Sequence, residues 1–243
     1  MRPMNYLLWL ILLLSITILG CEDSTSNESG PIPSFTPTDS TYKELKQFIN
    51  ILVKNAPSNS NGSSSSKPLL VKISGKLYGK NIWYKLSHLA TALRNIEIYS
   101  SLDLSGTIGI NRMVETRFSI YLVNIILPQE VSSIDNRAFS WCQGLKQITI
   151  PDSVRFIGDV AFESCKNLQS ITIPNSVDYI GYAAFFKCIN LEKITLSNQI
   201  TSIGAYTFAA CHKLSNVTIP NKVKTIDEAA FAECRSMTKI TIP

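Results

Sequence analysis

Five of the six cysteines recur at a constant interval of 23 residues, and they are the first side chains to consider for metal or redox chemistry: Cys142, Cys165, Cys188, Cys211 and Cys234. Zinc sites bring cysteines together as closely spaced pairs, with roughly two to four residues between them. No two cysteines of this chain are that close. We therefore expect no metal site.

Disulfide bonds between these cysteines depend on how the 23-residue intervals stack. If each interval forms one coil, neighbouring Cα atoms would lie about 4.8 Å apart, the usual spacing of strands. A disulfide allows about 4.4 to 6.8 Å, so distance alone does not exclude pairing. A column of five leaves one cysteine unpaired, and a buried cysteine otherwise packs as a small apolar residue. We expect five reduced, buried thiols.

Nucleophilic catalysis would require a serine or cysteine beside a base that a third side chain orients. The only histidines, His88 and His212, lie far apart in the sequence, and no such triad is visible. Glycine-rich phosphate loops are absent, and Asp159 and Glu228 are single acids at positions expected to face solvent. The sequence predicts no enzyme, no catalytic residue and no cofactor.

The interval of 23 residues extends to most apolar positions in the second half of the chain. Residues 129–243 hold five regular units, and residues 102–127 fit a sixth, degenerate unit in which Asn111, Thr116 and Ser119 replace an isoleucine, a phenylalanine and a cysteine. A repeat of this length predicts a solenoid in which each unit forms one coil. Two of the repeated columns are Ile134, Ile157, Ile180, Ile203 and Ile226, and Phe139, Phe162, Phe185, Phe208 and Phe231.

The residues within one unit predict the course of a coil. Ile148 and Ile150 alternate as in a strand, which ends at Pro151 because proline cannot donate to a ladder. The next apolar residues form a second wall, and the spacing of Ala161-Phe162-x-x-Cys165 is that of one helical turn. We expect an α/β repeat solenoid.

The unit Leu-x-x-Ile-x-Ile-Pro-x-x-Val-x-x-Ile-Gly-x-x-Ala-Phe-x-x-Cys resembles the BspA-like leucine-rich-repeat family, which is widespread in bacterial surface proteins and common in spirochaete lipoproteins. The resemblance covers residues 129–243, and 102–128 less specifically. Ser197 departs from it at the proline, and Asp135 and Asp227 at the glycine. It implies a leucine-rich-repeat array that binds rather than catalyses, with host extracellular-matrix proteins, another bacterial surface or a host receptor as candidate ligands.

The segment 1–20 has the pattern of a lipoprotein signal peptide, in which an apolar run from Tyr6 to Leu19 follows Arg2. A membrane span needs about 18 to 20 apolar residues, so this run is short for an anchor, although an uncleaved anchor is the alternative. Ile18-Leu19-Gly20-Cys21 resembles a bacterial lipobox, in which Cys21 is the lipidated residue.

The segments between the signal peptide and the repeats predict a tethered cap. Residues 21–40 read as a flexible tether, 41–54 as an amphipathic helix and 55–68 as a Ser/Asn-rich linker. Residues 69–105 are expected to form a β-α-β cap before the solenoid of residues 106–243. Its parts are a strand over 69–73, a helix over 81–94 and a strand over 96–104.

The open sheet face carries a column of threonines flanked by polar and basic residues: Thr149, Thr172, Thr195, Thr218 and Thr241, with Lys193 and Lys239 beside the column. Cross-strand threonine pairs contribute about 0.2–1 kcal/mol each simply by suiting a β surface. The face therefore has two interpretations, a solvated sheet or a mildly basic platform for a protein or a glycan.

Four aromatic residues gather on two coils, in positions that are small or charged in the other units: Phe156, Tyr179, Tyr182 and Phe186. Phe156 and Tyr179 hold the same position in consecutive units and should lie one above the other, while Tyr182 and Phe186 are one helical turn apart. Such a patch is a candidate anchor for a protein partner. Alternatively, Phe156 and Tyr179 tuck into the coil wall and the N-terminal helix covers the rest.

Composition narrows the class of protein further. With 45% hydrophobic and 17% charged residues the chain can bury a core, and its net charge of +5 forms no basic stripe for nucleic acid. We expect a secreted lipoprotein of the outer membrane or cell surface, held to the membrane by lipid only, that binds an extracellular protein or glycan. A structural or antigenic coat lipoprotein, or a scaffold facing the periplasm, is the alternative.

Overall fold

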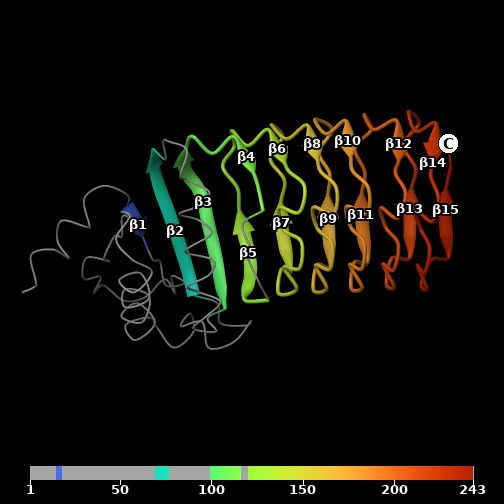
Figure 1. Cartoon of the computed structure of the whole chain (residues 1–243), viewed down its shortest axis with the longest axis horizontal. Coiled ribbons are helices and arrows are strands. Elements are labelled where there is room, and N and C mark those ends of the chain that lie inside the picture. The colour runs from blue at the N-terminus through green and yellow to red at the C-terminus, as the bar shows by residue number, and fades with distance from the viewer. Residues whose placement is uncertain (1–14, 18–68, 77–98, 116–119, 243) are drawn as a thin grey trace, which may run out of the picture.

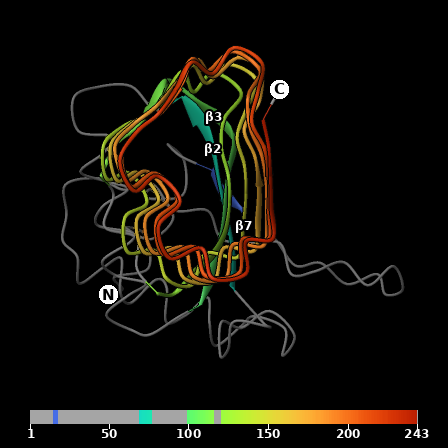
Figure 2. The ribbon, with the colours of Figure 1, turned by 90° about the vertical axis from the view of Figure 1, so that its right-hand side faces the viewer.

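A computed structural model of the chain describes residues 15–17, 69–76, 99–115 and 120–242. The coils stack side by side along one axis (Figure 1), and viewed along that axis they share a common outline (Figure 2). The expected tether, helix 41–54 and linker 55–68 lie outside the described residues, as does the signal peptide apart from Ser15–Thr17. The prediction of a repeat solenoid is confirmed.

The first wall of the solenoid consists of the longer strands, which pair in parallel between adjacent coils except at β7 and β9. In β7, β9 and β13 the central residue is buried and both neighbours are exposed, the alternation expected of a half-buried strand. The strands of this wall are β3 (Ser100–Ile108), β5 (Leu122–Ile126), β7 (Gln147–Thr149), β9 (Ser170–Thr172), β11 (Lys193–Thr195), β13 (Asn216–Thr218) and β15 (Lys239–Thr241).

The second wall consists of two-residue strands whose second residue belongs to the isoleucine column. That residue is buried in every strand except β14. The strands of this wall are β4 (Arg112–Met113), β6 (Ser133–Ile134), β8 (Phe156–Ile157), β10 (Tyr179–Ile180), β12 (Ser202–Ile203) and β14 (Thr225–Ile226).

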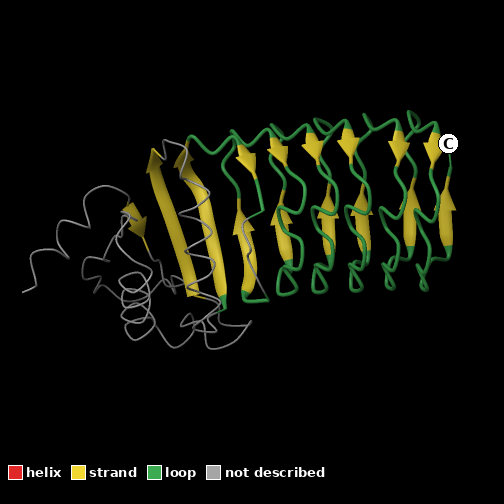
Figure 3. Ribbon diagram, viewed as in Figure 1, coloured by secondary structure: helices red, strands yellow, loops and turns green. Residues whose placement is uncertain are grey.

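The third wall is built from turns, and the prediction of a helical turn at Ala161–Cys165 is wrong. It comprises the segments 137–141, 160–164, 183–187, 206–210 and 229–233. The first and last residue of every segment have a left-handed backbone, with φ from 50° at Val160 to 64° at Trp141. A right-handed helix cannot pass through such residues. Figure 3 accordingly contains no helix in the part of the chain that the structure describes.

Backbone bonding explains why the third wall is not helical. The N–H of Phe139 donates to the carbonyl of Ala161 in the next coil (2.8 Å), and Phe162 donates to Ala184 in the same way (2.7 Å). In an α-helix these N–H groups would bond four residues back along their own segment. Spacing of three residues between Phe162 and Cys165 fits a helix and these turns equally well. The fold is therefore a β-solenoid rather than an α/β solenoid.

The structure describes two strands in the region of the expected cap, of which the second runs over Ser100–Ile108 where 96–104 was expected. β2 (Leu69–Lys76) pairs in parallel with β3. The helix expected over 81–94 lies outside the described residues, so a β-α-β cap is not supported. β1 (Ser15–Thr17) pairs antiparallel with β2, although it belongs to the expected signal peptide. Cleavage before Cys21 would remove β1 and leave that edge of β2 open.

The degenerate unit departs from the strict period. Leu102 pairs with Ile125, 23 residues on, but Met113 pairs with Ile134, 21 residues on. The first coil therefore has two extra residues before its second strand. As a result the buried residue in the isoleucine column is Met113, not Asn111, and Ile108, one repeat before the buried Val131, is 48% exposed.

Columns of identical side chains form the core. The rings of Phe139, Phe162, Phe185, Phe208 and Phe231 stack at centroid distances of 5.1 to 5.5 Å, with interplanar angles of at most 19°. The first four are fully buried, whereas Phe231 is half-buried. The phenylalanine column predicted from the sequence is confirmed.

Candidate functional site

The cysteine column is structural. All five repeat cysteines are reduced and buried, and the Sγ of Cys188 donates to the carbonyl of Phe162 in the preceding coil (3.2 Å). Cys165, Cys211 and Cys234 make the equivalent bond. Burial raises the pKa of Cys188 to about 12, so its thiol stays protonated and unreactive at neutral pH. These thiols are packing residues.

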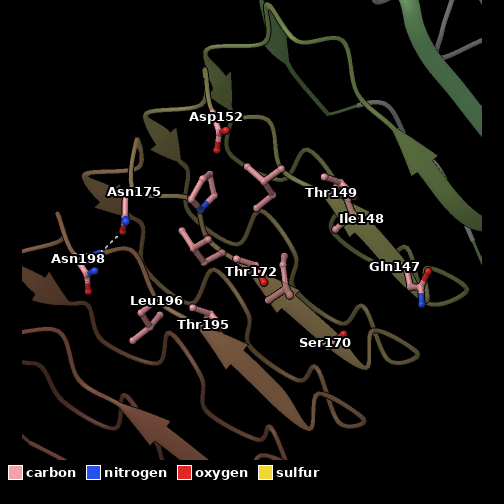
Figure 4. Close-up of a pocket in the computed structure, with 14 residues that line it drawn as sticks. Gln147, Ile148, Thr149, Asp152, Ser170, Thr172, Asn175, Thr195, Leu196 and Asn198 are labelled. Atoms are coloured by element: carbon pink, nitrogen blue, oxygen red, sulfur yellow. Dashed lines mark hydrogen bonds between the residues drawn. The ribbon is translucent and has the colours of Figure 1, made fainter.

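A groove of about 650 Å³ crosses the outer surface of the first wall. Thr149, Thr172 and Thr195 from three successive strands lie along it (Figure 4). Gln147 and Ser170 lie at the start of their strands. At the other end, the turns after the strands place a row of polar side chains along the groove: Asp152, Asn175 and Asn198. Hydroxyl, amide and carboxylate groups therefore line a surface about three coils wide.

The groove lies where the first wall is interrupted. β7 ends one hydrogen-bonded sheet and β9 ends another, although their coils are adjacent (Figure 1). In contrast, β9 and β11 pair over all three residues, and the N–H of Ile173 also donates to the carbonyl of Thr195 (2.8 Å). The hydrogen-bonded sheet is therefore interrupted beneath the groove. The interruption could not be predicted from the sequence, because β7 and β9 follow the same repeat.

The groove contains only part of the predicted sheet face. Thr218, Lys193 and Lys239 are exposed on the same wall but do not line the groove. Its one charged side chain is the carboxylate of Asp152. The mildly basic character expected of the face therefore belongs to its C-terminal half. The groove itself carries one acidic side chain and is lined by apolar residues such as Ile148, Ile171 and Leu196 as well as by polar ones.

Two ring pairs involve the predicted aromatic residues, Phe156 with Tyr179 and Tyr182 with Tyr206. Phe156 and Tyr179 stack at 5.0 Å with an interplanar angle of 2°, and they are 36% and 45% exposed. They lie one above the other as predicted, and they do not tuck into the wall. Tyr182 is 52% exposed and meets Tyr206 edge to face at 5.8 Å. Phe186 is half-buried beneath the ammonium group of Lys187, at 4.9 Å.

Side chains at the corner after the second wall bond the coils together. Asp159, expected to face solvent, is half-buried and accepts a hydrogen bond from the N–H of Tyr182 (2.8 Å). Asn136 accepts the equivalent bond from the N–H of Asp159 (2.9 Å). A methyl group at Gly181 would lie 2.5 Å from the backbone nitrogen of Asp159, which explains the glycine there. Asp159 is a structural residue, while Glu228 is exposed as expected.

Several residues of the candidate surfaces were not predicted from the sequence. Asn175 and Asn198 line the groove, and the N–H of Asn198 donates to the Oδ1 of Asn175 (2.9 Å). Their period of 23 residues could have revealed them. Trp141 is 54% exposed, and the residue one repeat before it, Phe118, is also aromatic, so the sequence could have indicated it. Tyr206 has no aromatic counterpart in the neighbouring units, so no column pointed to it.

The described residues also bear on the questions of a metal site and a membrane span. These residues contain no group of three histidines, cysteines or carboxylates arranged for a metal ion. Nor do they contain a helix that is long and apolar enough to span a bilayer.

The sequence model for the BspA-type leucine-rich repeat region matches residues 117–238 in six copies. The chain belongs to the BspA-type leucine-rich-repeat family. Six copies agree with five regular coils and one degenerate coil. No curated protein matches the chain.

Among solved structures, a leucine-rich repeat protein from Bacteroides ovatus is 30% identical with a TM-score of 0.56, over 60% of this chain and 38% of that one. A Treponema protein, the T. pallidum leucine-rich repeat protein, is 32% identical with a TM-score of 0.49, over 51% of this chain and 62% of that one. The chain therefore spans less than two thirds of the length of either protein. Proteins of the BspA type are repeat scaffolds, and this chain is such a scaffold.

Proposed function

We propose that this protein is a lipid-anchored, non-enzymatic binding module of the bacterial cell surface, whose partner is an extracellular protein or glycan. The groove on the first wall carries the proposal. Solenoid proteins bind partners over extended surfaces, and a groove three coils wide offers such a surface. Hydroxyl and amide groups donate and accept hydrogen bonds, as recognition of a polar polymer requires.

Anchoring through Cys21 would place the groove outside the cytoplasm. The lipobox-like Ile18-Leu19-Gly20-Cys21 supports lipidation, with each buried methylene of an acyl chain contributing about 0.8 kcal/mol of membrane affinity. The Ser- and Asn-rich residues between Cys21 and β2 give the solenoid reach from the membrane. Host extracellular-matrix proteins are the candidate partners that we would test first.

The test uses one substitution inside the groove and the same substitution outside it. Thr172 lies in the middle of the groove, whereas Thr218 holds the same strand position two coils along and does not line it. We expect the full chain to bind at least one of immobilised fibronectin, laminin, collagen or a printed glycan array. Thr172→Lys should weaken that binding about tenfold, or roughly 1.4 kcal/mol, and Thr218→Lys should leave it unchanged.

Equal effects of the two substitutions would overturn the groove as the binding surface. Absence of binding to every probe, with the protein accessible to protease on intact cells, would instead favour the coat lipoprotein. Protection from protease on intact cells would place the protein on the periplasmic side and contradict the surface location.

A further inference from the structure

The stack of exposed rings on the second wall ends abruptly at Tyr179. Phe156 and Tyr179 are partners in the parallel pairing of β8 and β10, and the residue one repeat beyond Tyr179 is Ser202. Ser202 in turn pairs with Thr225. One face of the Tyr179 ring therefore meets Phe156, while the layer on its other side holds only a small hydroxyl side chain.

The opposite end of the stack is different. Ser133 precedes Phe156 in the same column, and Arg112 precedes Ser133. The guanidinium group of Arg112 pairs with the carboxylate of Asp135 at 2.5 Å. Ser133 is a small residue like Ser202, but its hydroxyl donates to the carboxylate of Asp135 (2.8 Å), the partner of Arg112. The position equivalent to Asp135 at the Tyr179 end is Gly204, which has no side chain to bind a serine there.

The backbone of the second wall is loosened at the same interval. At other intervals, the residue before each two-residue strand donates its N–H to the carbonyl of the equivalent residue in the preceding coil. These bonds run from Arg155 to Ser132 (2.9 Å), from Asp178 to Arg155 (3.0 Å) and from Lys224 to Thr201 (2.8 Å). Within the described residues the equivalent bond from Thr201 to Asp178 is missing, and β10 and β12 belong to separate sheets.

A second bond is missing beside the first. The N–H of Gly181 donates to the carbonyl of Ile157 (2.8 Å), and the N–H of Asp227 donates to the carbonyl of Ile203 (2.9 Å). Among the described residues there is no equivalent hydrogen bond from Gly204 to Ile180. The third wall of these coils is intact, since Ala183 donates to Ala205 at 3.0 Å. Within the described part of the chain, the N–H groups of Thr201 and Gly204 and the carbonyls of Asp178 and Ile180 thus lack a backbone partner at one local opening.

The two coils also lie further apart at this interval. A methyl group at Gly204 would lie 3.9 Å from the backbone nitrogen of Tyr182, whereas one at Gly181 would lie 2.5 Å from the equivalent nitrogen of Asp159. Thr201 is exposed and Ser202 is half-buried. We call Tyr179, Thr201, Ser202 and Gly204 the Tyr179 slot.

We propose that the Tyr179 slot binds one pyranose ring of a neutral glycan. A sugar ring has an apolar C–H face that packs on an aromatic ring, and hydroxyl groups that both donate and accept hydrogen bonds. The slot offers an aromatic face together with backbone donors, backbone acceptors and hydroxyl groups. A guanidinium or ammonium group only donates, so it would leave the N–H groups of Thr201 and Gly204 unmatched. The carboxylate of Asp178, next to Tyr179, disfavours an acidic sugar.

This site is independent of the groove. It lies on the second wall, and none of its residues lines the groove. A groove substitution such as Thr172→Lys should leave it intact, so failure of either proposal is recognised separately.

The decisive variant fills the slot instead of removing a contact. Ser202→Phe places a third ring in the column, where it continues the stack of Phe156 and Tyr179. Ser133→Phe adds a ring at the other end of the same column and is the matched control. Tyr179→Ala removes the ring face on which the sugar would pack.

Binding is measured by saturation-transfer NMR and titration calorimetry on the full chain with lactose, cellobiose and N,N′-diacetylchitobiose. We expect at least one disaccharide to bind, with its C–H protons saturated most strongly. Ser202→Phe and Tyr179→Ala should each weaken binding at least about tenfold, and Ser133→Phe should not change it. We also expect Ser202→Phe to melt no lower than the unchanged protein. If it melts lower, the decision rests on Tyr179→Ala.

Three results would overturn the proposal. One is the absence of binding by all three disaccharides. Another is a disaccharide affinity that Tyr179→Ala leaves intact. The last is preferential binding of an arginine-containing peptide that Ser202→Phe abolishes, since the slot would then hold a cation.

Discussion

Replacing Phe185 with alanine tests whether the stacked phenylalanine column holds the coils together. Phe185 is fully buried and stacks on Phe162 at 5.1 Å and on Phe208 at 5.5 Å. Truncation of a buried phenylalanine costs about 3–5 kcal/mol, and two lost ring pairs place Phe185→Ala at the upper end of that range. Phe231 is half-buried and has one described ring neighbour, Phe208 at 5.3 Å. Phe231→Ala should therefore cost about half as much, roughly 2 kcal/mol.

Urea denaturation of the full chain, followed by circular dichroism, gives both values. Each coil contacts only its neighbours, so a single transition must persist in both variants for the free energies of unfolding to be compared. We expect Phe185→Ala to lower the melting temperature by roughly 8–20 °C, using about 2–4 °C per kcal/mol for a chain of this size. Equal losses for the two variants, or a loss below about 1 kcal/mol for Phe185→Ala, would refute the idea that stacking neighbours set the cost.

The remaining predictions concern the thiols, the corner glycines and the anchor. Cys188 has a folded pKa of about 12, against about 8.5 when unfolded, so above that lower value only the unfolded state loses its proton. This thiol should therefore leave the free energy of unfolding unchanged below about pH 8 and lower it at higher pH. In urea titrations, Cys188→Ala should make the decrease with pH shallower by about 1.4 kcal/mol per pH unit. An unchanged slope would contradict the burial of this thiol. Gly181→Ala should destabilise by about 1–3 kcal/mol because its methyl group meets Asp159 at 2.5 Å, whereas Gly204→Ala, with 3.5 Å of clearance, should change stability by less than about 0.5 kcal/mol in the same assay. Cys21→Ala should move the protein from the detergent phase to the aqueous phase in Triton phase separation, and retention in detergent after processing at the same site would contradict lipidation.

The columns of the repeat could be predicted from the sequence, because identical side chains at one interval must stack. Phe162, Cys165 and Ile157 are buried as expected, and Phe156 lies directly over Tyr179. The third wall could not be predicted in this way. Its left-handed residues include Val160 and Trp141, which rarely adopt that backbone, so only the bonds between coils reveal it.

The candidate sites were less accessible to sequence reasoning. The threonine column lies on the wall that carries the groove, but the column gave no reason for the groove to end before Thr218. Openings between β7 and β9 and between β10 and β12 occur in units whose sequences keep the period. Loss of hydrogen bonds between adjacent coils depends on small displacements of the backbone, and a period of 23 residues carries no information about them.

The bonds of the third wall have an electrostatic consequence. The N–H groups of Phe139, Phe162, Phe185 and Phe208 all donate toward the coil that follows, so their peptide dipoles align along the solenoid axis. In an α-helix such alignment produces a positive N-terminal and a negative C-terminal end. Here the order along the chain is reversed, because the N–H groups point toward the later coils. At the third wall, the last described coil accordingly favours negative charge, and Glu228 and Glu233 lie on or next to this wall.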